Sequence, residues 1–71
     1  MNKTIAISFI KKGYVINNGE YSFNLDFDDN GRVLVVYYIG QHYHEMTLAE
    51  FIDSSWLNND NWSIEQLKEV A

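Results

Sequence analysis

The chain alternates apolar and polar residues over several short stretches, and this period of two predicts β-strands with one buried face. Residues 4–11 predict a first strand, and residues 14–16 predict a short second one. The clearest alternation runs through residues 21–28, where every second side chain is aromatic or leucine. Residues 32–39 are apolar on both faces, which is typical of a central strand or of one covered on both sides. Residues 42–46 predict a further short strand.

Turn signals separate these stretches. Asn18-Gly19 and Asn30-Gly31 are the dipeptides most typical of tight hairpins, because both residues accept a positive φ. Gly40-Gln41 can turn the chain once more. The order therefore predicts an antiparallel meander.

The pattern then changes to helix-start signals. Thr47 and Glu50 form a capping box, in which each side chain can bind the other residue's backbone amide. Ser63 and Gln66 repeat the arrangement. Each box is flanked by apolar residues that can form a hydrophobic staple. We expect one helix over residues 48–55 and a second over residues 64–70.

Together these elements predict an α+β fold. We expect residues 1–71 to form a single domain, with an antiparallel four- to five-stranded β-meander followed by two short C-terminal helices packed on one sheet face. The strand over residues 32–39 has two apolar faces, and the helices can cover only one of them. The side chains on the other face then need a second cover, and we expect these to be Val33, Val35, Tyr37 and Ile39. The residues expected to pack the helices onto the sheet are Leu48, Phe51, Ile52, Trp56, Ile64 and Leu67.

Composition narrows the class of protein. The 71 residues include 11 aromatics, no cysteine and no proline, so the chain is too apolar for disorder and has no disulfide framework. No apolar run approaches the roughly 18 residues that a membrane span needs. The N-terminus shows no secretory signal pattern, and we expect a cytoplasmic protein.

Charge is distributed unevenly along the sequence. The formal net charge is −5, but residues 1–12 carry three lysines and no acid, so residues 13–71 carry a net −8. Such a surface repels nucleic acid and anionic lipid and attracts basic protein surfaces. We therefore expect a protein partner with a basic surface, no direct nucleic-acid contact and no membrane contact.

Two motifs could suggest metal chemistry. The run Asp26-Phe27-Asp28-Asp29-Asn30-Gly31 matches the first half of a calcium loop, but Tyr37 stands where the bidentate glutamate belongs. His42 and His44 share a strand face, yet a zinc site needs further ligands. The sequence leaves weak metal binding open at both places and assigns no metal and no cofactor. No catalytic motif is present, so we expect a non-enzymatic protein.

The acidic side chains give the strongest candidate site. Carboxylates on strands and helices are spaced by roughly 5–7 Å, close to the phosphate spacing of DNA, so a rigid row of them can occupy a basic nucleic-acid channel. Tyr43 is a possible aromatic anchor beside them. The predicted partner-binding residues are Asp26, Asp28, Asp29, Tyr43, Glu45, Glu50 and Asp53.

The chain is short and acidic, is rich in tyrosine and asparagine, contains no cysteine and has a compact α+β layout. In these features the whole chain resembles the small acidic inhibitors of phages and mobile elements, including anti-CRISPR proteins. This resemblance implies stoichiometric, non-catalytic blocking of a nucleic-acid-handling enzyme by DNA mimicry, and it transfers no individual residue. Two alternatives stay open. The chain could be a small structural or assembly protein that forms a homo-oligomer, such as a homodimer, or a complex subunit, or it could be an immunity or antitoxin protein.

Overall fold

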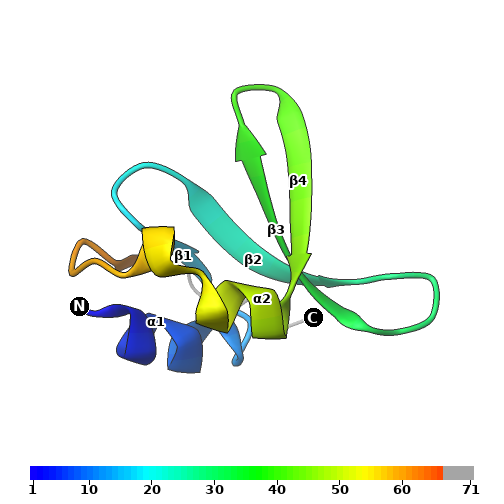
Figure 1. Cartoon of the computed structure of the whole chain (residues 1–71), viewed down its shortest axis with the longest axis horizontal. Helices are drawn as coiled ribbons and strands as arrows, with labels where there is room; N and C mark the ends of the chain where they lie inside the picture. Colours follow the sequence, from blue (N-terminus) through cyan, green and yellow to red (C-terminus); the bar gives the residue numbers. More distant parts are fainter. Residues whose placement is uncertain (67–71) are drawn as a thin grey trace.

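The computed structural model describes residues 1–66. Its elements are α1 (Lys3–Ile10), β1 (Val15–Asn17), β2 (Ser22–Phe27), β3 (Val33–Ile39), β4 (His42–Thr47), α2 (Leu48–Asp53), a 3-10 turn η1 (Ser55–Leu57) and β5 (Ser63–Gln66). The five strands form one antiparallel sheet in the order β4-β3-β2-β1-β5. The predicted α+β class and the meander from β1 to β4 are confirmed. Figure 1 shows the β3–β4 hairpin projecting away from the two helices.

The predicted strand over residues 4–11 is wrong, because these residues form α1. The Asn2 side chain caps the helix by accepting the Ile5 amide at 3.0 Å. Ala6 and Ile10 enter the core from one side of the helix, whereas Ile5, expected on a buried strand face, is 45% exposed. The apolar residues of this segment fit either period, and the helix cap and the helical spacing of the buried residues decide between them.

The predicted second helix is also wrong where the structure describes it, because Ser63–Gln66 form the edge strand β5. Ile64 pairs with Ile16 of β1 in antiparallel register. Tertiary pairing has overridden the local capping signal of Ser63 and Gln66. The remaining residues of that expected helix, from Leu67 onward, lie outside the described part of the chain.

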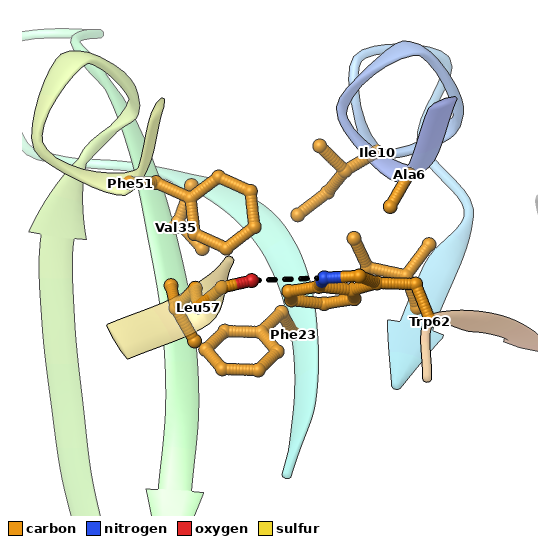
Figure 2. Packing of buried hydrophobic residues seen from close by; sticks show 8 residues of the cluster. Ala6, Ile10, Phe23, Val35, Phe51, Leu57 and Trp62 are labelled. Carbon is orange, nitrogen blue, oxygen red and sulfur yellow. Dashed lines mark hydrogen bonds between the residues drawn. The ribbon is translucent and has the colours of Figure 1, made fainter. Parts of the chain in front are cut away.

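One face of the sheet carries the core. Ala6 and Ile10 from α1 and Phe51 from α2 pack on the same strand residues, so both helices lie on this side, which we call the core face. Figure 2 shows the Trp62 indole packed in this cluster, with its Nε1 donating to the Leu57 carbonyl at 3.0 Å. The buried residues of this cluster are Ala6, Ile10, Ile16, Phe23, Val35, Phe51, Leu57 and Trp62.

The expected helix packing is only partly correct. Phe51 is buried and Leu48 packs against the core, but Ile52, Trp56 and Ile64 are exposed. The helix α2 has only six residues, so it presents one strong apolar anchor to the sheet rather than a long stripe.

The helices cover the row of β3 side chains that the sequence analysis expected to remain without a helix cover. Val35, in the row expected to lack a cover, is fully buried beneath the helices. Because side chains alternate along a strand, Leu34, Val36 and Tyr38 lie on the other side of the sheet.

A buried lysine joins the two helices. The Lys3 ammonium donates to the carbonyl oxygens of Ile52 and Ser54, each at 2.7 Å. These carbonyls lie at the end of α2, where a helix lacks internal donors and favours a cation. Burial lowers the pKa of Lys3, and the nearby charge of Asp53 opposes this shift. The sequence placed Lys3 only among surface charges.

Candidate protein-binding face of the sheet

The side of the sheet opposite the helices is the candidate site, and we call it the outer face. Strand register defines it, because paired residues in an antiparallel sheet point to the same side. No helix of the described residues contributes to it. Its side chains are those of Asn17, Ser22, Asn24, Asp26, Leu34, Val36, Tyr38, Tyr43, Glu45, Thr47, Ser63 and Glu65.

The aromatic part of the outer face lies on the β3–β4 hairpin. Tyr38 and Tyr43 are directly paired across the two strands, and their rings meet edge to face at 5.5 Å between centroids. Each is about half exposed, at 57% and 49%. Val36 lies next to them and is buried. Two half-exposed tyrosines held against each other form a rigid surface of the kind that protein interfaces use as anchors.

Two of the predicted acids join this aromatic pair. The Tyr43 hydroxyl donates to Glu45 Oε2 at 3.1 Å. Asp26 lies on the same face on β2, where it pairs with Leu34 of β3, and its charge also acts on the Tyr43 hydroxyl. Partial burial, the hydrogen bond to Glu45 and these two charges raise the pKa of Tyr43. The Tyr43 hydroxyl thus serves as a hydrogen-bond donor to Glu45 on this face.

A third acid of the outer face was not predicted as a site residue. Glu65 on β5 accepts hydrogen bonds from the Ser22 hydroxyl and from Asn17 Nδ2, the latter at 3.0 Å. These donors lower the pKa of Glu65, so its charge is fixed in place. The sequence analysis missed it because Glu65 was assigned to a helix. The alternation of Ser63, Ile64 and Glu65 was the signal that could have found it.

The strands place no lysine or arginine on the described part of the outer face. Arg32, in the turn just before β3, forms a salt bridge with Asp28 at 2.7 Å. Lys11 and Lys12 directly follow α1, the helix that packs on the core face. The outer face is therefore uniformly acidic in its charged strand side chains, with Asp26, Glu45 and Glu65.

The other predicted site residues lie elsewhere. Asp28 and Asp29 are in the turn between β2 and β3, away from the helices (Figure 1). Glu50 is in the first turn of α2, where its carboxylate accepts the Thr47 amide at 2.9 Å and the Thr47 hydroxyl accepts the Glu50 amide at 3.1 Å. This arrangement confirms the first capping box and lowers the pKa of Glu50. Asp53 ends α2 near Lys3. The structure thus brings together three of the seven predicted residues, Asp26, Tyr43 and Glu45.

The loop that resembles part of a calcium site is organised by its own hydrogen bonds. Asp28 Oδ1 accepts the backbone amides of Asn30 and Arg32, at 2.9 and 2.8 Å. These bonds and the Arg32 side chain lower the pKa of Asp28. Its carboxylate therefore serves the turn.

His42 and His44 share one face of β4, as expected, and this is the core face. The His44 ring stacks on Tyr37 with centroids 5.3 Å apart. Within residues 1–66 no group of three or more metal-ligating side chains is gathered.

A polar depression of about 320 Å³ lies where the start of α1 meets the loop after η1. The Lys3 ammonium at its edge is already bound to two backbone carbonyls, and the other lining side chains are short and polar. Apart from Lys3, its lining consists of the amide, hydroxyl and carboxylate side chains of Asn2, Thr4, Asn58, Asn59 and Asp60.

Comparisons with protein-family models, with curated proteins and with solved structures found no match for this chain. None of the helices in the described part is long and apolar enough to cross a membrane. A binding site on the outer face is therefore inferred from the geometry described above.

Proposed function

We propose that this protein is a non-enzymatic binding module whose outer face docks on a basic surface of another protein. The observation that supports this function is the cluster of Asp26, Glu45 and Tyr43, which places two carboxylates and a half-exposed aromatic ring on one rigid face without a neighbouring cation on the strands. Opposite charge speeds the approach of a basic partner, and a central aromatic ring supplies contact area once the surfaces meet.

The kind of partner follows from the same chemistry. A protein surface that presents lysines and arginines to a nucleic-acid backbone also accepts carboxylates held on a firm scaffold. We therefore propose that the module acts as a stoichiometric inhibitor, occupying the nucleic-acid channel of a nuclease or a similar effector by DNA mimicry. The acids available for this role are Asp26, Glu45 and Glu65, with Asp29 exposed at the adjoining turn. Asp28 and Glu50 serve local structure instead.

The test is affinity capture from a lysate of the source cells with the tagged protein, at low and at high salt. We expect a basic nucleic-acid-binding protein to be retained at low salt and released at high salt, because screening weakens contacts between exposed charges. The captured protein is then purified, and its binding and nucleic-acid cleavage are measured with the pure module.

A matched pair of variants locates the contact. The double variant Asp26→Lys/Glu45→Lys reverses the outer face, and Glu20→Lys/Asp60→Lys changes the net charge equally at exposed positions elsewhere. We expect the first to abolish binding and the second to retain most of it. Equal binding by both double variants would show that the outer face is not the contact surface. A partner that handles no nucleic acid would refute the inhibitory role.

A further inference from the structure

The two edges of the sheet are built differently. Within residues 1–66 the edge strand β5 has four residues, and a register shift interrupts its pairing with β1. The opposite edge strand, β4, has six residues in continuous register with β3. It contains no proline, lysine or bulge, three of the devices that keep an edge strand from pairing with another chain, and Glu45 is its one charged residue apart from the histidines. In the described part of the chain, no strand pairs with the free edge of β4, the edge that points away from β3.

The hairpin turn fixes which backbone groups of β4 are free. Ile39 and His42 pair across the two-residue turn Gly40-Gln41, in which glycine alone has a positive φ, as in a type II′ turn. In such a hairpin the pair that closes the turn exchanges hydrogen bonds, and such pairs then alternate along the ladder. His42, His44 and Met46 therefore bond to β3, whereas the amides and carbonyls of Tyr43 and Glu45 point away from it.

An independent contact agrees with this alternation. The Thr47 amide is two residues beyond Glu45 and should also point away from β3. It donates to the Glu50 carboxylate instead of to β3. The free edge of β4 therefore offers two N–H groups and two carbonyl groups, those of Tyr43 and Glu45.

We propose that two copies of this protein pair through their β4 strands, antiparallel, with His44 opposite His44 of the second copy. In this register Tyr43 lies opposite Glu45 of the second copy, and Glu45 lies opposite its Tyr43. Both are hydrogen-bonded pairs, so four hydrogen bonds satisfy all the free groups of both edges. The result is one continuous sheet of ten strands with a two-fold axis at His44.

The neighbouring registers are poorer. Centring the pair on Tyr43 leaves Glu45 opposite the turn residue Gln41, and centring it on Glu45 sets two carboxylates against each other and requires the Thr47 amide that Glu50 already holds. In the proposed register the side chains are compatible as well. Tyr43 already donates to Glu45 within its own strand, at 3.1 Å, and the dimer offers it a second carboxylate across the strands.

The dimer is testable on the purified protein. Because it rests on four hydrogen bonds and a narrow contact, we expect a weak association with a dissociation constant of about 10 µM to 1 mM, measured by sedimentation over a range of protein concentrations. In a non-hydrogen-bonded antiparallel pair the two Cα atoms are only about 4.5 Å apart. An isotope-mixed sample should therefore give an intermolecular nuclear Overhauser cross-peak between the Hα atoms of His44 in the two copies.

Two matched pairs of variants test the edge. Tyr43→Pro removes an outward amide but no hydrogen bond to β3, whereas Tyr43→Ala removes the same side chain and keeps the amide. We expect the proline variant to be monomeric and the alanine variant to dimerise within a few-fold of the wild type. His44→Lys sets two lysines against each other at the axis and should also prevent pairing, whereas His44→Gln should allow it. Circular dichroism and thermal unfolding confirm that each variant is folded.

A wild-type protein that stays monomeric, a dimer without the His44 cross-peak, or equal dimerisation within both pairs would overturn the proposal. The proposal is independent of the binding function above. Each copy carries a net charge of −5, so added salt should strengthen edge pairing by screening their repulsion, whereas it should weaken capture of a basic partner. Asp26→Lys on β2 should leave edge pairing intact while weakening that capture.

Discussion

The two faces of the sheet use the same kinds of residue for different purposes. On the core face, Phe23 contacts Tyr37, Phe51 and Trp62 and is fully buried. On the outer face, Tyr38 and Tyr43 contact each other and remain about half exposed. A small domain has little apolar surface to bury, and this one concentrates its buried surface on one side. The other side can then carry unpaired charge without weakening the core.

The largest expected effect is on the core face. Phe23→Ala removes a fully buried ring that touches three other aromatic side chains, and we expect it to lower the free energy of unfolding by about 3–5 kcal/mol. Urea unfolding measures this change. The matched change on the outer face, Tyr38→Ala, should cost less than about 1 kcal/mol because the ring is 57% exposed. Similar losses in both variants would show that the outer face belongs to the folding core.

The next effect concerns the helices that cover the core face. Lys3→Met keeps the apolar stem but removes the ammonium that donates to the carbonyls of Ile52 and Ser54. The Ser54 carbonyl still accepts the Leu57 amide at 3.3 Å, so the main loss is the donor to the Ile52 carbonyl. We expect a loss of about 1–3 kcal/mol, the usual cost of unpairing buried polar groups. The control is Lys11→Met, at an exposed position just after α1, which should change stability little. A neutral Lys3→Met would mean that the link between α1 and α2 is dispensable.

A smaller effect separates the two capping boxes. Thr47→Ala removes the hydroxyl that accepts the Glu50 amide at 3.1 Å, and we expect a cost of about 1 kcal/mol. Ser63→Ala changes the first residue of the other predicted box, which lies in β5, and should cost no more than a few tenths of a kcal/mol. Urea unfolding of the two variants side by side measures the difference. An equal cost would indicate a capping role for Ser63 that its strand does not provide.

The same pair of boxes shows how far the sequence could predict the fold. The turns and the alternating strands of the central meander were predictable, because they depend on local residues such as Asn18-Gly19 and on side-chain alternation. The box at Thr47 was predictable because nothing competes for it. The box at Ser63 failed because β1 needs a second neighbour, and Ile64 and Glu65 supply it. Such a contact joins segments about fifty residues apart, so the local sequence alone could not rank the short alternation of Ser63, Ile64 and Glu65 above the competing capping signal.

The candidate site was predictable to a similar degree. Asp26 on β2 and Tyr43 and Glu45 on β4 alternate onto one face of the sheet, so their shared face follows from the correct strand assignment. Asp28 and Glu50 were misjudged because net charge does not reveal which carboxylates are used by a turn or a helix cap. Lys3 was missed for a related reason. Its role depends on where α2 ends relative to α1, which is a tertiary fact.

The smallest expected effect is the dependence of stability on pH. Hydrogen bonds lower the pKa values of Asp28, Glu50 and Glu65 in the folded chain. The unfolded chain therefore binds protons more readily at these groups, so their contribution is full above the ordinary values of 3.8 for Asp and 4.5 for Glu. It is lost as the pH falls through the lowered values of the folded state. Urea unfolding at a series of pH values should show stability declining in this acidic window.

Glu50→Gln sharpens this last prediction, because glutamine can still complete the capping box but does not titrate in this range. We expect the variant to lose less stability than the wild type between about pH 7 and pH 3, while the contributions of Asp28 and Glu65 persist. Asp29→Asn, at an exposed carboxylate in the hairpin turn, is the control and should leave the pH profile nearly unchanged. If Glu50→Gln also left the profile unchanged, the acid sensitivity would have to come from groups other than the helix cap, and the outer-face carboxylate Glu65 would be the next to test.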